Sequence, residues 1–91
     1  MIVYNYSRKE DCKQVVDSQT VATVTTTYIG KAKRETYDAT LSEAQNFARA
    51  IWAIEKRVED TSTGISTRYR PNKSQKFEFV WTDRATITPY I

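Results

Sequence analysis

The chain has 91 residues, of which 40% are hydrophobic, and a formal net charge of +3. This length is enough for one hydrophobic core but not two, so we predict a single domain over residues 1–91. The lack of histidine and the single cysteine, Cys12, exclude an internal disulfide, the usual zinc sites and catalysis by a histidine base.

The N-terminal part of the chain is rich in residues that favour strands. Residues 1–6 (Met-Ile-Val-Tyr-Asn-Tyr) predict a first strand, and the capping-box spacing of residues 7–10 predicts a short helical turn after it. Threonine and other β-branched residues dominate from Thr20 to Ile29. Gly30-Lys31 then has the pattern of a two-residue hairpin turn, which predicts a second strand of the hairpin over residues 32–38.

The next segment has the pattern of a long amphipathic helix. Thr40 and Glu43 have the spacing of a capping box, and apolar residues then recur at helical intervals. These apolar positions are Leu41, Ala44, Phe47, Ala48, Ile51, Ile54 and Val58. The opposite face carries Arg49, Lys56 and Arg57, with Trp52 at its border, and Glu55 is the one charged residue near the apolar side.

The C-terminal part predicts a return to sheet. Residues 59–64 lack apolar side chains and predict a loop, and residues 65–70 alternate as in a strand. The Pro-Asn-Lys-Ser sequence at residues 71–74 is typical of a turn. A second hairpin strand follows over residues 76–82, with Phe77, Phe79 and Trp81 on one side, and residues 86–91 predict an edge strand.

Together these elements predict an α+β fold. An antiparallel sheet of about five strands would pack against one long amphipathic helix, whose apolar stripe would bury the aromatic row of the second hairpin. No apolar run approaches the roughly 18 residues of a membrane span, so we expect a soluble protein of the cytoplasm that makes no membrane contact.

The strongest functional signal is the basic second hairpin. It brings together four basic side chains, no acidic one and one aromatic: Arg68, Tyr69, Arg70, Lys73 and Lys76. Alternation places Arg68 and Arg70 on one strand face, where arginine forks bind phosphate or carboxylate groups, and places Tyr69 on the other. The alternative is a solvated hairpin whose charges prevent edge-to-edge pairing.

A second candidate contact lies on the predicted helix. Arg49, Trp52 and Lys56 would form it, because tryptophan and arginine are frequent at the centres of protein interfaces. The alternative is that Trp52 belongs to the edge of the core, as tryptophan usually does. Lys31 and its basic neighbours near the Gly30 turn are interpreted as ordinary surface, since Glu35 follows them.

The sequence gives no support for an enzyme. Cys12 has no histidine to activate it, and a small buried thiol is the simpler interpretation. The acidic residues at 55–60 lack the ordered spacing of a calcium loop, and the chain has only two glycines, so no glycine-rich phosphate loop is present. We therefore predict no catalytic residues, metal or cofactor.

The order of an early strand, a hairpin, a capped helix and a later strand resembles small phage-encoded inhibitors. In particular, the helix start Thr40-Leu41-Ser42-Glu43-Ala44 and the strand at residues 65–69 are similar to those of some anti-CRISPR proteins directed at type I surveillance complexes. The resemblance implies a non-catalytic protein that occludes a nucleic-acid channel or a subunit surface on a host complex. The basic charge departs from that of the acidic, DNA-mimicking inhibitors, so we do not expect DNA mimicry.

Three hypotheses follow. The first is a non-enzymatic binding protein, of phage or mobile-element origin, that blocks a host nucleoprotein complex by occupying its surface. The second is a small basic module that binds DNA or RNA directly through the same hairpin. The third is a homo-oligomeric structural protein that pairs through an exposed strand edge.

Overall fold

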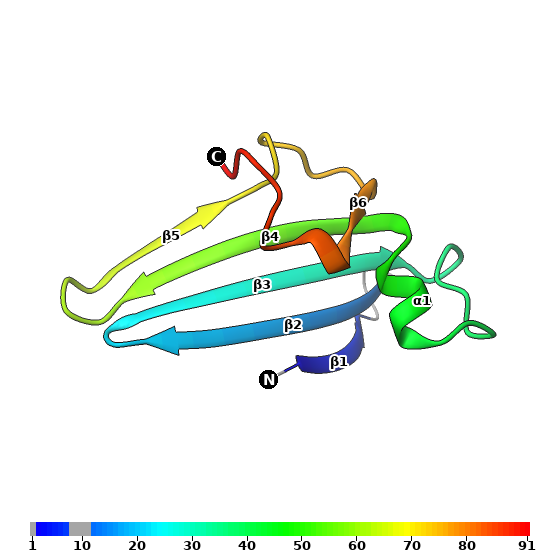
Figure 1. Ribbon diagram of the computed structural model, residues 1–91, viewed down its shortest axis with the longest axis horizontal. Coiled ribbons are helices and arrows are strands. Elements are labelled where there is room, and N and C mark those ends of the chain that lie inside the picture. Colours follow the sequence, from blue (N-terminus) through cyan, green and yellow to red (C-terminus); the bar gives the residue numbers. More distant parts are fainter. Residues whose placement is uncertain (1, 8–11) are drawn as a thin grey trace.

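The computed structural model describes the backbone of residues 2–7 and all of residues 12–91. Five strands follow one another in chain order across an antiparallel sheet, and a sixth pairs with β4 (Figure 1). The strands are β1 (Ile2–Ser7), β2 (Cys12–Val21), β3 (Val24–Lys33), β4 (Ala50–Asp60), β5 (Ile65–Tyr69) and β6 (Phe79–Val80). The helical elements are α1 (Glu43–Phe47) and the short 3-10 helix η1 (Trp81–Asp83).

The N-terminal strands agree only partly with the prediction. The first strand is confirmed as β1, whereas residues 8–11 of the predicted helical turn lie outside the described residues. Strands β2 and β3 form a hairpin, but its turn is at Ala22 and Thr23, where Ala22 has a φ of +55°. The predicted turn at Gly30-Lys31 is wrong, because β3 runs straight through Gly30 to Lys33.

Gly30 is needed for packing rather than for a turn. A Cβ atom at this position would lie 2.6 Å from Cε3 and 2.8 Å from Cζ3 of Trp81, and 3.1 Å from Cγ1 of Val15. The indole of Trp81 therefore lies directly on the backbone of β3. A glycine inside a strand often marks such a close approach, which is easily mistaken for a turn in the sequence.

The predicted long helix is also wrong. Residues 50–60 form β4, which pairs with β3 on one side and with β5 and β6 on the other. In this strand Trp52 and Ile54 point to the same face and are completely buried. The segment carries both a helical and a two-residue apolar pattern, and backbone pairing with three strands stabilises the second. The fold is therefore mainly antiparallel sheet, and the described helix α1 has only five residues.

The cap of α1 lies two residues later than predicted. Ser42 is the N-cap: its Oγ accepts from the backbone N–H of Gln45, whose side chain accepts from the backbone N–H of Ser42. This is a complete capping box, formed by Ser42 and Gln45 instead of Thr40 and Glu43. Two overlapping capping patterns in one sequence explain the shift.

The buried Asn46 explains why α1 ends after little more than one turn. Its Nδ2 donates to the carbonyl of Asp38 at 2.8 Å, and its Oδ1 accepts from the Asp38 N–H at 3.1 Å. The backbone carbonyl of Asn46 accepts from Nε1 of Trp52 at 2.9 Å. In a longer helix this carbonyl would accept a hydrogen bond from the backbone N–H of Ala50. The Trp52 indole takes that place, which stabilises the turn of the chain into β4.

The C-terminal elements differ from the predicted second hairpin. The strand at residues 65–70 is confirmed as β5, and the turn after it contains Asn72 and Lys73 with positive φ. The predicted strand over residues 76–82 is wrong, because only β6 is a strand there and it pairs with β4 instead of β5. Residues 86–91 form only an isolated bridge between Pro71 and Tyr90.

The core lies on one face of the sheet, which is covered by α1, η1 and the C-terminal segment (Figure 1). Its fully buried apolar side chains are Val15, Ala32, Trp52, Ile54 and Trp81. Seven partly buried residues pack around them: Tyr28, Tyr37, Phe47, Ile51, Phe79, Ile87 and Tyr90. The rings of Trp52 and Trp81 have centroids 6.1 Å apart, so a small aromatic cluster supplies much of the buried apolar area.

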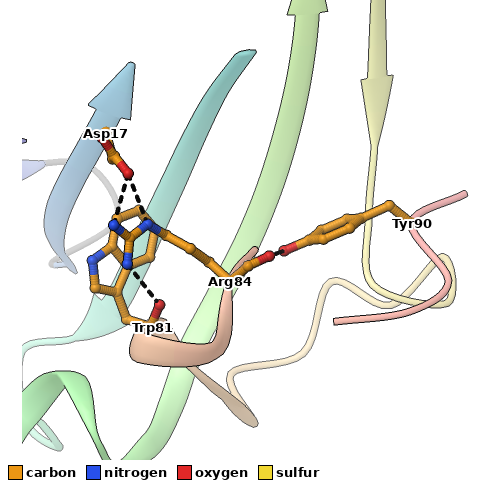
Figure 2. Close-up of polar contacts among 4 residues, drawn as sticks. All are labelled: Asp17, Trp81, Arg84 and Tyr90. Carbon is orange, nitrogen blue, oxygen red and sulfur yellow. Dashed lines mark hydrogen bonds and ion pairs between the residues drawn. The ribbon is translucent and has the colours of Figure 1, made fainter. Parts of the chain in front are cut away.

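Arg84 fastens the C-terminal segment to β2 (Figure 2). Its Nε and Nη2 donate to Oδ2 of the buried Asp17 at 3.0 and 2.7 Å, and its Nη1 donates to the carbonyl of Trp81 at 3.2 Å. The guanidinium carbon lies 4.7 Å from the Trp81 ring centroid, and the Tyr90 hydroxyl donates to the Arg84 carbonyl at 2.6 Å. A tyrosine hydroxyl is protonated at neutral pH, and burial, followed by the proximity of Tyr28, raises the pKa of Tyr90 further.

Replacing Gly30 by alanine is expected to destabilise the protein by about 1–3 kcal/mol, because the new methyl group must displace the Trp81 ring. The measurement is the free energy of unfolding from denaturant titration. Gly64→Asn is the control, since Gly64 has a φ of +72° but no neighbour within 4 Å of a Cβ atom, and asparagine tolerates this backbone. Equal stability of Gly30→Ala and the wild type would contradict the packing role.

Asp17→Asn is expected to cost about 2 kcal/mol, because it leaves the partly buried Arg84 without its counter-ion. Asp83→Asn, at an exposed position of η1, should change the free energy of unfolding by less than about 0.5 kcal/mol. In the double variant Asp17→Asn/Arg84→Met the loss should be smaller than the sum of the two single losses. Additive losses would show that the two residues do not act as a pair.

Candidate functional site

The side chains that alternate with the core residues form the opposite face of the sheet, which contains a hollow of about 460 Å³. Its lining comes from four neighbouring strands and the residue after β5. The lining residues are Gln14, Ile29, Lys31, Ala53, Glu55, Arg57, Arg68 and Arg70. We call the whole of this face of the sheet the open face, and the part of it that these residues line the hollow.

Positive charge is concentrated at this hollow. Four cationic side chains and one anionic side chain line it, which gives a net charge of +3. The formal charge of the whole chain is also +3, so the remaining residues are neutral in sum. The lining of the hollow by itself therefore carries a charge equal to the net charge of the whole chain.

Glu55 joins two of the arginines. Its Oε2 lies 3.0 Å from Nη2 of Arg57, and its Oε1 lies 3.2 Å from Nη2 of Arg70. The Glu55 side chain is only 10% exposed, whereas those of Arg57 and Arg70 are 30% and 36% exposed. A nearly buried carboxylate thus holds two partly exposed guanidinium groups in fixed positions, and the exposed part of each group still carries N–H donors.

Arg68 stands directly across from Arg57 in the pairing of β4 with β5. Like charges at opposed positions destabilise a sheet. The side chain of Arg68 is exposed and forms no hydrogen bond or ion pair with the part of the chain that the structure describes. Two opposed arginines beside a hollow, of which only Arg57 has an anionic partner, are the kind of local conflict that proteins retain at binding sites.

The structure separates the residues of the predicted basic hairpin. Arg68 and Arg70 lie together in the hollow, and Tyr69 points to the other face, because it pairs with Lys56. This is the alternation that the sequence predicted. Lys73 and Lys76 lie in the exposed segment after β5 and do not line the hollow.

The second predicted contact does not exist as a surface group. Trp52 is completely buried in the core and cannot touch a partner, because the predicted helix is strand β4. Arg49 donates to the carbonyl of Thr36 and to Asn46, so it holds the loop before α1. Lys56 lies on the core face, with Nζ 5.4 Å from the Tyr90 ring centroid.

Three charged residues of the hollow, Lys31, Glu55 and Arg57, were not among the predicted site residues. Arg57 and Glu55 were placed on a helix, where they do not share a side, whereas in a strand they point to the same face. Lys31 was assigned to ordinary surface because the turn at Gly30 was placed wrongly. The charged residue on the apolar side of the predicted helix, Glu55, was the signal that the strand pattern fits better.

Among residues 2–7 and 12–91, no three or more Cys, Asp or Glu side chains lie close enough together to hold a metal ion. No described helix is long and apolar enough to cross a membrane.

The sequence matches no protein-family model, and comparison with curated proteins and with solved structures gives no significant match. The open face is therefore the feature of this protein that bears on its function.

Arg68→Glu is expected to raise the free energy of unfolding by about 0.5 kcal/mol, because it replaces an opposed pair of arginines by an opposite-charge pair. Denaturant titration at low salt measures this change. Ser66→Glu, on the same face of β5 but opposite Glu59, is the matched control and should be destabilising or neutral. A loss of stability in Arg68→Glu would mean that Arg68 and Arg57 do not repel each other.

Proposed function

We propose that this chain is a non-enzymatic binding protein that uses the open face to occupy an anionic surface of a larger partner. The observation that carries the proposal is the convergence of Lys31, Arg57, Arg68 and Arg70 on one hollow that contains a single carboxylate. Arginine is preferred at interfaces because its fork makes two directed hydrogen bonds and because it loses little hydration on burial.

The exposed lysines have a separate part in this proposal. Lys73 and Lys76 follow Arg70 in the chain but do not line the hollow. Flexible surface lysines mainly increase the rate of association by attracting an oppositely charged partner, and contribute less to the stability of the complex. Their replacement should therefore slow association, whereas replacement of an arginine in the hollow should speed dissociation.

In its narrower form, the proposal is an inhibitor of phage or mobile-element origin that acts in the cytoplasm of a host cell and blocks a nucleoprotein complex. The open face supports this form because such complexes expose phosphate and acidic protein surfaces together. The resemblance to anti-CRISPR inhibitors contributes less, since the segment that carried it is the single turn α1 followed by β4.

The second candidate function is direct binding of DNA or RNA. The polar lining favours it, because interfaces with nucleic acid are more polar and more positively charged than those with protein. In this case the affinity falls steeply as salt is added, because binding releases counterions from the phosphate backbone.

The test is a binding series at 50 and 200 mM salt with poly-glutamate, duplex DNA, duplex RNA and single-stranded DNA. At least one polyanion should bind at low salt, and Arg68→Glu should weaken that binding at least tenfold, because it reverses a charge in the hollow. Arg34→Glu, with the same charge change in the exposed segment after β3, is the matched control and should have an effect below about threefold. Failure of the folded protein to bind any of these polyanions would refute the proposal.

A further inference from the structure

Glu55 contacts only one nitrogen atom of each of its two arginines, Arg57 and Arg70. Each Glu55 oxygen takes one Nη2 atom, at 3.0 Å from Arg57 and 3.2 Å from Arg70, so neither guanidinium makes a two-point contact. Nε of Arg57 is buried and has no hydrogen-bond partner within the described protein. A buried donor without an acceptor is unfavourable, but this Nε is closed to solvent. An oxyanion in the hollow would therefore contact the exposed part of the Arg57 side chain, which is 30% exposed.

Arg68 completes the arrangement. It stands opposite Arg57, is exposed, and is left without an anionic partner in the described chain. An anion seated between these two arginines would remove their mutual repulsion and gain charge-assisted hydrogen bonds from both. A phosphate suits this position better than a second carboxylate, because it has more acceptor oxygens with which to compete against Glu55.

The composition of the hollow argues against a peptide or a stacked single strand. Its apolar lining consists of Ile29 and Ala53, and no aromatic side chain lines it. Protein interfaces are usually anchored by aromatic residues packed in pockets as well as by arginine, and single-stranded nucleic acids are held by stacking on aromatic rings. Contacts to a phosphate backbone need neither of these.

Hydroxyl groups continue the same face along the β2–β3 hairpin. Ser18 and Thr27 lie opposite each other with their oxygens 3.1 Å apart, and Thr20 and Thr25 with theirs 2.8 Å apart. Serine and threonine hydroxyls commonly donate to phosphate and sugar oxygens. The open face therefore offers a cationic hollow followed by polar donors, which fits an extended phosphate backbone.

We propose that the hollow binds a phosphate group of a nucleic-acid backbone through Arg68 and the remaining N–H groups of Arg57 and Arg70. In this proposal Glu55 is an internal counter-ion. It positions two arginines and, because its negative charge repels the ligand, it also lowers the affinity for phosphate. The inference rests on the proposed function and narrows its partner to phosphate-bearing molecules.

Glu55→Gln removes the charge but keeps the size of the side chain and one of its two acceptor oxygens, so one of the two arginines can keep its contact. The affinity for duplex DNA at 50 mM salt, measured by fluorescence anisotropy, should rise about fivefold, since one repulsive charge next to the phosphate is removed. Glu59→Gln makes the same charge change on the same face of β4 but outside the hollow, and should raise the affinity less than twofold. Arg68→Gln should lower it about tenfold.

Inorganic pyrophosphate, added as a competitor of duplex DNA, distinguishes the source of the phosphate group. Competition by inorganic pyrophosphate indicates recognition of the phosphate group itself, whereas binding of duplex DNA without such competition indicates recognition of an extended backbone. Both results support the proposal. Binding of poly-glutamate without binding of DNA or pyrophosphate would overturn it and would leave the proposed function intact.

An unchanged or weaker affinity of folded Glu55→Gln would also overturn the inference, because Glu55 would then have only a positioning role. If this variant does not fold, the site is tested instead in the wild-type protein. Duplex DNA or pyrophosphate is titrated into the protein and the arginine Nε–H signals are followed by NMR. Duplex DNA, or pyrophosphate where it competes, should shift the signals of Arg57, Arg68 and Arg70 and leave that of Arg84, on the core face, in place. No shift at Arg57 and Arg68 would refute the site.

Discussion

The close contact between Trp81 and the backbone of Gly30 determines which side of this sheet is closed. The indole lies where a side chain on β3 would stand, and the segment that carries it is fastened by the ion pair of Arg84 with Asp17. A 91-residue chain has little apolar material, and most of its large rings gather at this contact. Since one face takes that material, the opposite face is left to polar and charged residues.

The open face owes its charge to this division of the sheet. In β4, Trp52 and Ile54 point into the core. Because side chains alternate along a strand, the odd-numbered residues Glu55 and Arg57 point to the other side. The pairing of β4 with β5 then adds Arg68 opposite Arg57. A cluster of like charges in one hollow costs stability, and the carboxylate of Glu55 offsets only part of this cost. Binding of an anion is the simplest physical reason for such a cluster.

How much of the fold could be predicted depends on whether the sequence pattern of each element is local. The strands at β1 and β5 and the turn after β5 follow from short-range preferences, and so does the placement of Arg68 and Arg70 on one side of Tyr69. The segment from Ala50 to Asp60 could not be assigned in this way, because its apolar residues fit a helix and a strand equally well. Its partners are up to 36 residues away in the chain (Val24 with Asp60), and their pairing decided the outcome.

The sequence by itself determined the composition of the chain: one basic segment at residues 68–76, no histidine, and strand-forming residues through most of its length. Only the tertiary structure decided that Glu55, Arg57 and Lys31 join Arg68 and Arg70, and that Trp52 is buried. The physical reason is that a side chain's face depends on the element that contains it. Where local preferences are balanced, backbone pairing between distant strands and the burial of two tryptophans select that element.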